Sequence, residues 1–176
     1  MNTLEDAWEW YRSVRTNLVL MRRIADRHFR ELSIESTIRQ DERFKHLDPV
    51  ALGASATHGL EPLNDLAVLV LFSVFESIVR NRVRADLAIE AGTLEHPILK
   101  RAAESALETV EAGAFFRVLE PFKIEISSHL IEDVNQVRRY RNWVAHGRRD
   151  EPSEIITPEV AFERLGRFIK AIQPDA

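Results

Sequence analysis

The chain has 176 residues, of which 45% are hydrophobic and 30% charged, and its formal net charge is −4. This length and composition predict about one globular domain with a buried core. The negative charge excludes an attraction of nucleic acid by the molecule as a whole, so any polyanion site must be local. The absence of cysteine excludes disulfides, thiolate catalysis and cysteine-ligated zinc.

Neither the N-terminus nor the apolar segments resemble a targeting or membrane segment. Residues 1–6 are acidic and lack the apolar region of a signal peptide. The longest apolar stretch, residues 66–75, contains Ser73 and is too short to cross a bilayer. We therefore expect a cytoplasmic protein without a membrane partner.

The first predicted element is a long amphipathic helix. Thr3 and Asp6 have the spacing of a helix-capping pair, and apolar residues recur every three or four positions over about residues 4–32. Residues 33–60 lose this period, and the glycine, serine and threonine residues at 53, 55, 57 and 59 are typical of a loop. We expect an irregular insertion or loop at residues 33–60, with one short helix near residues 37–44.

Proline and glycine punctuate the middle of the chain. Pro62 suits the first turn of a second helix, the most apolar element, which covers about residues 63–91 and ends at Gly92. Pro97 begins a third helix that reaches about residue 111. Residues 114–119 are expected to form one or two turns between Gly113 and Pro121.

Two further helices complete the chain. Ser127 or Ser128 caps a fourth helix that ends at Gly147, and Thr157 caps a last helix that ends near residue 172. No segment has the alternating period of a strand. The sequence therefore predicts a single all-α domain over residues 1–176, an up-and-down helical bundle of about five helices.

A charged residue interrupts the apolar seam of the fourth predicted helix. The seam has spacings of four, three, four and three and consists of Leu130, Val134, Val137, Arg141 and Val144. A buried guanidinium without a partner costs on the order of several kcal/mol. Glu76 lies in an equally apolar run on the second helix, so we expect Glu76 and Arg141 to face each other.

His146 lies five residues after Arg141, which is about 140° round an ideal helix. One regular helix therefore does not present both side chains on the same face, whereas Asn142 shares the face of His146. A site that uses Arg141 and His146 needs a distorted helix end, the edge of a shallow groove, or a second subunit related by a two-fold axis beside this helix.

Residues 141–147, Arg-Asn-Trp-Val-Ala-His-Gly, resemble the Arg-Asn-x-x-x-His signature of the HEPN superfamily (higher eukaryotes and prokaryotes nucleotide-binding domains). Residues 75–80 resemble a segment on the earlier core helix of that family. The resemblance implies a helical bundle, usually a homodimer with residues 141–147 lining the dimer cleft. Many members are metal-independent ribonucleases, and some are toxins paired with a small nucleotidyltransferase. Others have lost catalysis and serve as scaffolds or nucleotide binders.

The resemblance assigns a role to each residue of the signature. Arg141 would stabilise charge on the scissile phosphate, and Asn142 would orient His146 or a phosphate oxygen. His146 would act as general base on the ribose 2′-hydroxyl or as general acid on the leaving 5′-oxygen. Histidine suits either role because a free imidazole has a pKa of about 6.5. Attack by the 2′-hydroxyl would need no metal and no cofactor.

Residues around the signature are candidates for supporting roles. Glu76 and Arg80 would support the site from the second helix. Four arginines flank the signature with no acid before Asp150, and they could follow an RNA backbone or form a solvated helix end: Arg138, Arg139, Arg148 and Arg149. The other histidines show no spacing typical of metal ligands, so we expect no metal site.

Structural explanations compete with these roles. Arg141 could form only an ion pair with Glu76, and His146 could be a C-cap histidine favoured by the helix dipole. Glu76 and Arg80 have the spacing of an ordinary i,i+4 pair.

Three functional hypotheses follow. The first is a HEPN-like homodimeric endoribonuclease that acts on RNA, as a toxin with a nucleotidyltransferase-type antitoxin or as a defence component. The second is a non-catalytic HEPN-type module that binds a nucleotide or a partner protein. The third is an unrelated helical bundle in which the signature is a coincidence. An exposed His146 in a positively lined cleft favours the nuclease, whereas a buried His146 favours the non-catalytic module. A solvent-exposed Arg141 favours the unrelated bundle.

Overall fold

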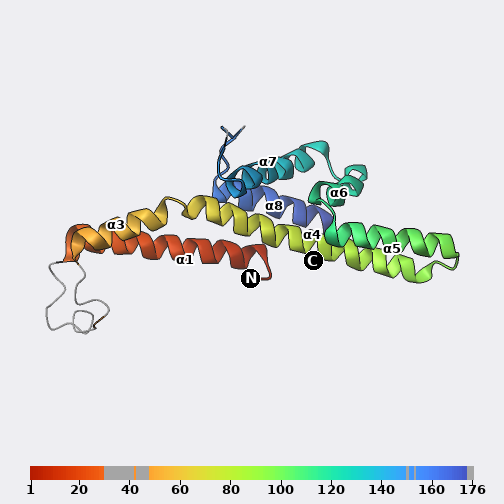
Figure 1. The fold of residues 1–176 in the computed structure, drawn as a ribbon, viewed down its shortest axis with the longest axis horizontal. Helices are drawn as coiled ribbons and strands as arrows, with labels where there is room; N and C mark the ends of the chain where they lie inside the picture. Colours follow the sequence, from red (N-terminus) through yellow and green to blue (C-terminus); the bar gives the residue numbers. More distant parts are fainter. Residues whose placement is uncertain (30–41, 43–47, 150, 153, 174–176) are drawn as a thin grey trace. The chain divides into compact units, whose positions relative to one another are not determined.

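The structure is a computed structural model that describes residues 1–29, 42, 48–149, 151, 152 and 154–173. Every regular element in these ranges is helical, which confirms the predicted all-α class. The elements in chain order are α1 (Leu4–Arg23), the π-helix η1 (Ile24–His28), α3 (Pro49–Leu60), α4 (Leu63–Thr93), α5 (Pro97–Ala112), α6 (Phe115–Leu119), the 3-10 helix η3 (Glu120–Ile124), α7 (Ser128–Ala145) and α8 (Pro158–Ile172) (Figure 1).

Contacts group the chain into two compact units where the sequence predicts one domain. The large unit comprises residues 1–7 and 68–176, and the small unit comprises residues 8–67. Helices α1 and α4 each contribute residues to both units. The candidate residues of α4 and α7 all belong to the large unit.

An aromatic cluster forms the core of the large unit. Phe75 is fully buried, and its ring centroid lies 5.8 Å from Phe115 and 5.6 Å from Phe168 in edge-to-face geometry. Val134 and Val137 of α7 are also fully buried, and α7 packs along α8. This packing fixes the position of α7, which carries the HEPN-like signature.

The core of the small unit is much smaller. Its main cluster has three buried residues, Tyr11, Leu63 and Ala67, with partly buried side chains from α1 and α3 packed against them, and Ala25 and Ala56 are buried as well. The Tyr11 hydroxyl donates a hydrogen bond of 2.9 Å to Asn64 Oδ1, which gives this apolar cluster a polar anchor.

Most predicted helix ends are confirmed, and the capping groups explain them. The Thr3 hydroxyl accepts a hydrogen bond from the Asp6 amide, and Asp6 accepts one from the Thr3 amide, a reciprocal capping pair. Thr157 caps α8 at the predicted residue. The predicted end at Gly92 is wrong, since α4 continues to Thr93 and a methyl group at Gly92 would meet nothing within 4 Å.

The prediction of an irregular segment over residues 33–60 is wrong for its last part, because residues 49–60 form α3. Asp48 Oδ1 accepts a hydrogen bond from the Ala51 amide, which caps the helix, and Pro49 occupies its first turn. A Cβ atom on Gly59 would lie 3.3 Å from the Leu18 side chain. The glycines therefore allow close helix packing and do not mark a loop. The short helix predicted near residues 37–44 lies outside the described residues, except for position 42.

The first helix also differs from the prediction, which continued it to about residue 32. It is α-helical only to Arg23 and continues as η1 over Ile24–His28. Residues 30–32 lie outside the described residues.

One continuous stretch, residues 49–93, is long and apolar enough to cross a membrane by length and composition alone. The expectation from the sequence concerned only residues 66–75 as a possible membrane segment, but the apolar character extends over α3 and α4. The core helix of a water-exposed protein passes the same test, and the apolar side chains Val68, Leu71 and Phe72 are buried within the large unit. This stretch is weak evidence for a membrane segment.

Candidate active site

The C-terminal end of α7 carries the HEPN-like signature and has a defined capping structure. Gly147 has a φ of +80°, a conformation that glycine adopts without a steric penalty. The Gly147 amide donates to the Val144 carbonyl at 3.1 Å, and the Arg148 amide donates to the Trp143 carbonyl at 3.0 Å. This pair of bonds is a Schellman cap, and it confirms that Gly147 ends the helix.

Arg141 lies where the seam of α7 meets α4, and its predicted pairing is confirmed. Its Nη2 atom lies 3.8 Å from Glu76 Oε2, and its guanidinium carbon lies 5.4 Å from the centre of the Phe72 ring. The side chain is 31% exposed, so the guanidinium is half-buried and keeps one side open to solvent. The hypothesis of an unrelated bundle predicted a solvent-exposed Arg141, whereas the side chain is only partly exposed.

Asn142 is the closest polar partner of Arg141. Its Oδ1 atom accepts a hydrogen bond of 3.0 Å from Arg141 Nη1, and its backbone carbonyl accepts one of 2.9 Å from the His146 amide. Asn142 therefore contacts the arginine through its side chain and the histidine through its backbone.

His146 is exposed and forms the C-cap of α7, with φ −91° and ψ 14°. Within the described part of the chain, its imidazole has no hydrogen bond or ion pair with Arg141 or Asn142. A single copy of the chain thus brings together Arg141, Asn142 and Glu76 and leaves His146 outside that network.

Glu76 is shared between two arginines. Its Oε1 atom accepts hydrogen bonds from Arg80 Nε at 3.0 Å and Arg80 Nη2 at 2.7 Å. Arg80 also donates to the carbonyl oxygens of Val110 and Gly113 at the end of α5. The predicted i,i+4 pair is therefore present, and Arg80 additionally joins α4 to the end of α5.

Gly113 must be a glycine for this junction to form. A Cβ atom there would lie 2.4 Å from the Thr109 carbonyl oxygen, which is closer than any real contact. The chain therefore turns tightly at the end of α5, and the freed carbonyl of Gly113 faces Arg80.

The four arginines around the signature differ in what they contact. Arg138 donates to Asn135, and Arg139 pairs with Glu132 on the exposed side of α7. The Arg148 guanidinium lies 5.8 Å from the centre of the Trp143 ring, a cation–π distance. Arg149 is exposed. Three of the four candidate RNA contacts therefore already have partners in the chain.

A buried charge cluster between α7 and α8 was not predicted. Asp133 is only 5% exposed and accepts a hydrogen bond of 3.0 Å from Arg167, while Arg164 Nε lies 3.7 Å from its other oxygen. Arg164 also donates to Glu154 in the segment after the signature. Arg164 follows buried Ala161 by three residues and precedes buried Phe168 by four, so its place on the apolar face of α8 was a usable signal.

No group of three or more potential metal ligands occurs among the described residues.

Burial raises the pKa of Tyr140, which precedes the signature by one residue, so the phenol stays protonated at neutral pH.

No protein-family model, no curated protein and no solved structure matches the chain. The family resemblance therefore depends on residues 141–147 and 75–80 themselves.

Proposed function

We propose that the protein is a metal-independent endoribonuclease of the HEPN type that acts as a homodimer through α7. The observation that carries the proposal is the end of α7. There, Glu76 and Asn142 hold the half-buried Arg141 guanidinium, and exposed His146 follows at the glycine-terminated end of the same helix. A partly buried cation and an exposed imidazole are groups that support cleavage of a phosphodiester by a ribose hydroxyl.

In this mechanism the 2′-oxygen attacks the adjacent phosphorus and the bond to the 5′-oxygen breaks, which leaves a 2′,3′-cyclic phosphate. One imidazole accepts the proton of the 2′-hydroxyl, and a second donates a proton to the departing 5′-oxygen. Arg141 stabilises the negative charge that develops on the phosphate oxygens. A homodimer supplies both imidazoles as two copies of His146, and it places the histidine of one copy near the arginine of the other.

This proposal includes a role as a toxin or defence component, for which a small nucleotidyltransferase would be the matching antitoxin. The overall charge of −4 disfavours strong unspecific binding of RNA, so we expect selective cleavage.

A second candidate is a non-catalytic HEPN-type module that binds a nucleotide or a partner protein. The observation that favours it is the pairing of Arg141 with groups of its own chain, because Glu76 competes with a phosphate for the guanidinium. In such a module residues 141–147 would stabilise the helix end and would have no chemical role.

Cleavage of RNA in excess EDTA separates the two candidates. We expect the parent protein to generate 2′,3′-cyclic phosphate ends, and we expect His146→Ala to reduce the rate by about 10²- to 10⁴-fold, the usual contribution of a general acid or base. His129→Ala is the matched control, since His129 lies on the same helix and its side chain is 83% exposed. No cleavage by a parent protein that is dimeric in solution would favour the module.

A further inference from the structure

One face of α1 and η1 carries a row of arginines that the proposed chemistry does not use. We call it the α1 arginine stripe, and it consists of Arg12, Arg15, Arg22, Arg23 and Arg27. At 100° per residue the four members on α1 fall within an arc of about 100°, whose edge at Arg22 adjoins the buried face. All five residues are exposed, and the stripe extends for about 22 Å at a rise of 1.5 Å per residue.

The stripe is poor in opposite charge. Residues 12–27 contain five arginines and one acid, Asp26, which gives this segment a formal charge of +4 in a chain of net charge −4. Arg12 pairs with Glu9, whereas Arg15, Arg22 and Arg23 have no ion pair with a described carboxylate.

Several exposed arginines elsewhere on the molecule have acidic partners. Arg82 pairs with Asp86, Arg84 with Glu111 and Arg101 with Glu104. Arg139 and Arg167 also pair with carboxylates, whereas Arg117 and Arg149 have no ion pair with a described carboxylate. Acidic partners are thus common for exposed arginines outside the α1 arginine stripe, and fewer members of the stripe have one.

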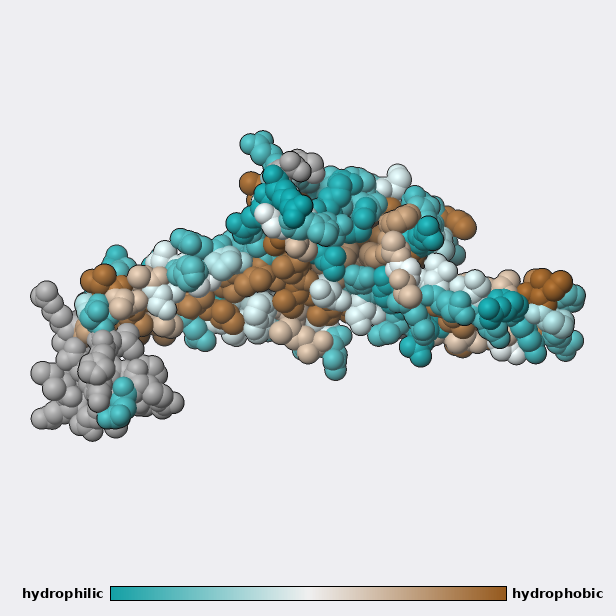
Figure 2. All heavy atoms as spheres, in the orientation of Figure 1, coloured by the Kyte–Doolittle hydropathy of each residue, from teal (hydrophilic) through white to brown (hydrophobic). Residues whose placement is uncertain are grey.

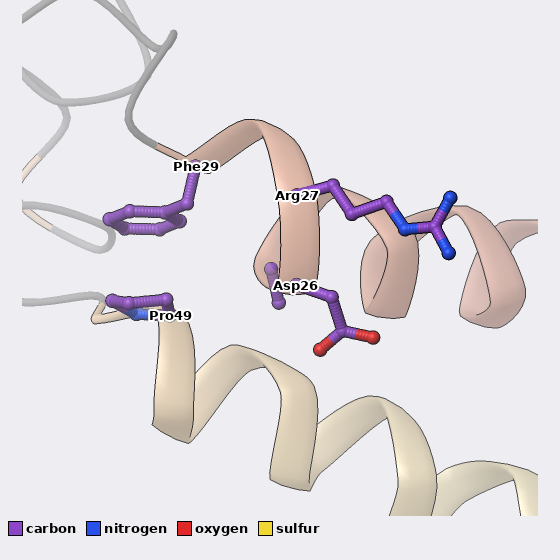
Figure 3. Close-up of a pocket in the computed structure, with 5 residues that line it drawn as sticks. Asp26, Arg27, Phe29 and Pro49 are labelled. Carbon is purple, nitrogen blue, oxygen red and sulfur yellow. The ribbon is translucent and has the colours of Figure 1, made fainter.

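A cation-lined hollow lies at the end of the stripe. Among the described residues, Val19, Arg22, Arg23, Asp26 and Arg27 line a cavity of about 170 Å³. Figure 3 shows the neighbouring pocket around Ala25, where the Arg27 side chain extends away from Phe29 and Pro49. Arg27 therefore continues the stripe past the last turn of α1.

The apolar side of α1 is already occupied, which argues against a membrane surface as the partner. Tyr11 is buried, and Val14 and Leu18 pack on the core of the small unit. A helix that lies in a membrane interface needs an apolar face free to enter the acyl region. The helix dipole accounts for arginines in the last turn of α1, but not for Arg12 and Arg15 further back.

We propose that the α1 arginine stripe binds the phosphate backbone of single-stranded RNA. The proposal rests on the proposed function, for which RNA is the substrate, and it assigns the binding of that substrate to a second surface, in the small unit. A row of cations along a helix matches a row of anions, and the backbone of a nucleic acid is such a row. Guanidinium groups suit it because they donate two parallel hydrogen bonds to one phosphate.

The test measures equilibrium binding of a fluorescent single-stranded RNA whose 2′-hydroxyls are methylated, so that the proposed reaction cannot consume it. The stripe variant combines Arg15→Gln, Arg22→Gln and Arg23→Gln, because glutamine keeps helix propensity. The control variant combines Arg82→Gln, Arg84→Gln and Arg101→Gln, which removes the same charge from arginines that have acidic partners. Circular dichroism verifies that both variants are folded.

We expect the stripe variant to bind on the order of tenfold more weakly than the parent, and the control variant to bind as the parent does. Each lost phosphate contact makes the slope of log K against log salt shallower by about 0.7 for a single strand, so the stripe variant should lose about 2 units of slope. Equal affinity and slope in both variants would overturn the proposal. So would stripe-dependent binding of phosphatidylserine vesicles without binding of RNA.

The same experiment keeps this proposal separate from the catalytic one. If the parent protein cleaves no RNA, and the parent and the His146→Ala variant bind the methylated RNA equally well, the nuclease proposal is contradicted. The stripe then remains an RNA-binding surface. If the stripe variant cleaves RNA with the KM of the parent, the nuclease proposal stands and the proposed RNA binding by the stripe is contradicted.

Discussion

Glu76 contacts both arginines of the candidate site, but it contacts them unequally. Two donors of Arg80 lie 2.7 and 3.0 Å from its Oε1 atom, within hydrogen-bond distance. Arg141 Nη2 lies 3.8 Å from Oε2, which is a charge contact without a hydrogen bond. Glu76 therefore neutralises Arg141 without holding it tightly, and the Arg141 guanidinium keeps the freedom to contact an incoming phosphate.

A double-mutant cycle tests this asymmetry. Combining Glu76→Gln with Arg80→Gln should give a coupling energy of about 1–2 kcal/mol in the free energy of unfolding, because a charge-assisted hydrogen bond is lost. Combining Glu76→Gln with Arg141→Gln should give less than about 0.5 kcal/mol, the range of a loose pair near the surface. Urea unfolding of the three single variants, the two double variants and the parent gives both values. A larger coupling to Arg141 would mean that the arginine is fixed for architecture, as the non-catalytic module requires.

Charged residues on apolar helix faces were the best predictors of contacts in the site. Arg141 in the seam of α7 led to Glu76, and the structure confirms that pair. The same reasoning applied to Arg164 on α8 would have led to Asp133, a contact that was not predicted. The contact of Arg80 with the carbonyls of Val110 and Gly113 was beyond prediction, since it depends on how tightly the chain turns after α5.

At the scale of elements, most helix boundaries could be predicted from the side chains that cap the helices. Ser127 marked the start of α7, and Thr157 followed by Pro158 marked the start of α8; each hydroxyl accepts a hydrogen bond from an amide of the first turn. Helix α3 was missed because its glycines and small residues have a composition typical of loops. A Cβ atom on Gly59 would lie 3.3 Å from the Leu18 side chain, so a larger residue would displace that side chain. Local composition does not distinguish a turn from a close helix contact.

The first turn of α1 should depend on pH through Asp6. Hydrogen bonds from the backbone amides of Asn2 and Thr3 to its carboxylate lower the pKa of Asp6 below its ordinary value of 3.8. Because the folded pKa is the lower one, the stabilisation is present above pH 3.8 and is lost as the pH falls through the folded pKa.

An NMR titration of the Asp6 side-chain carbon measures this pKa directly, and the helical chemical shifts of residues 4–7 report on the first turn. We expect fraying of this turn only below pH 3.8. Asp6→Asn is the control, since its amide oxygen accepts the same hydrogen bonds but does not titrate. A carboxyl that titrates at or above its ordinary value would show that the capping pair does not form in solution.

At the scale of the whole molecule, buried aromatic rings are concentrated in the large unit. Phe72, Phe75, Phe115 and Phe168 are all buried there, whereas the core of the small unit contains one buried ring, Tyr11, among its described residues. The large unit also presents apolar residues at its surface, including Ile89, Ile98 and Leu99 around the α4–α5 turn, where Figure 2 shows hydrophobic surface. Because the buried aromatic rings lie in the large unit, we expect this unit, which carries α7, to have the rigidity that a catalytic site requires.

Phe75 is the residue through which the core of the large unit should control the candidate site. It has no solvent exposure, its ring lies within 5.8 Å of Phe72, Phe115 and Phe168, and it immediately precedes Glu76. Phe75→Ala removes a buried ring, so we expect the free energy of unfolding to fall by about 3–5 kcal/mol in urea titrations. Amide hydrogen exchange in α7 should become faster, because Val134 and Val137 of this helix are buried in the same unit as Phe75. Phe116→Ala is the matched control, since this ring is 45% exposed and its loss should change stability little. Equal losses in the two variants would show that the aromatic cluster does not form the core that positions α7.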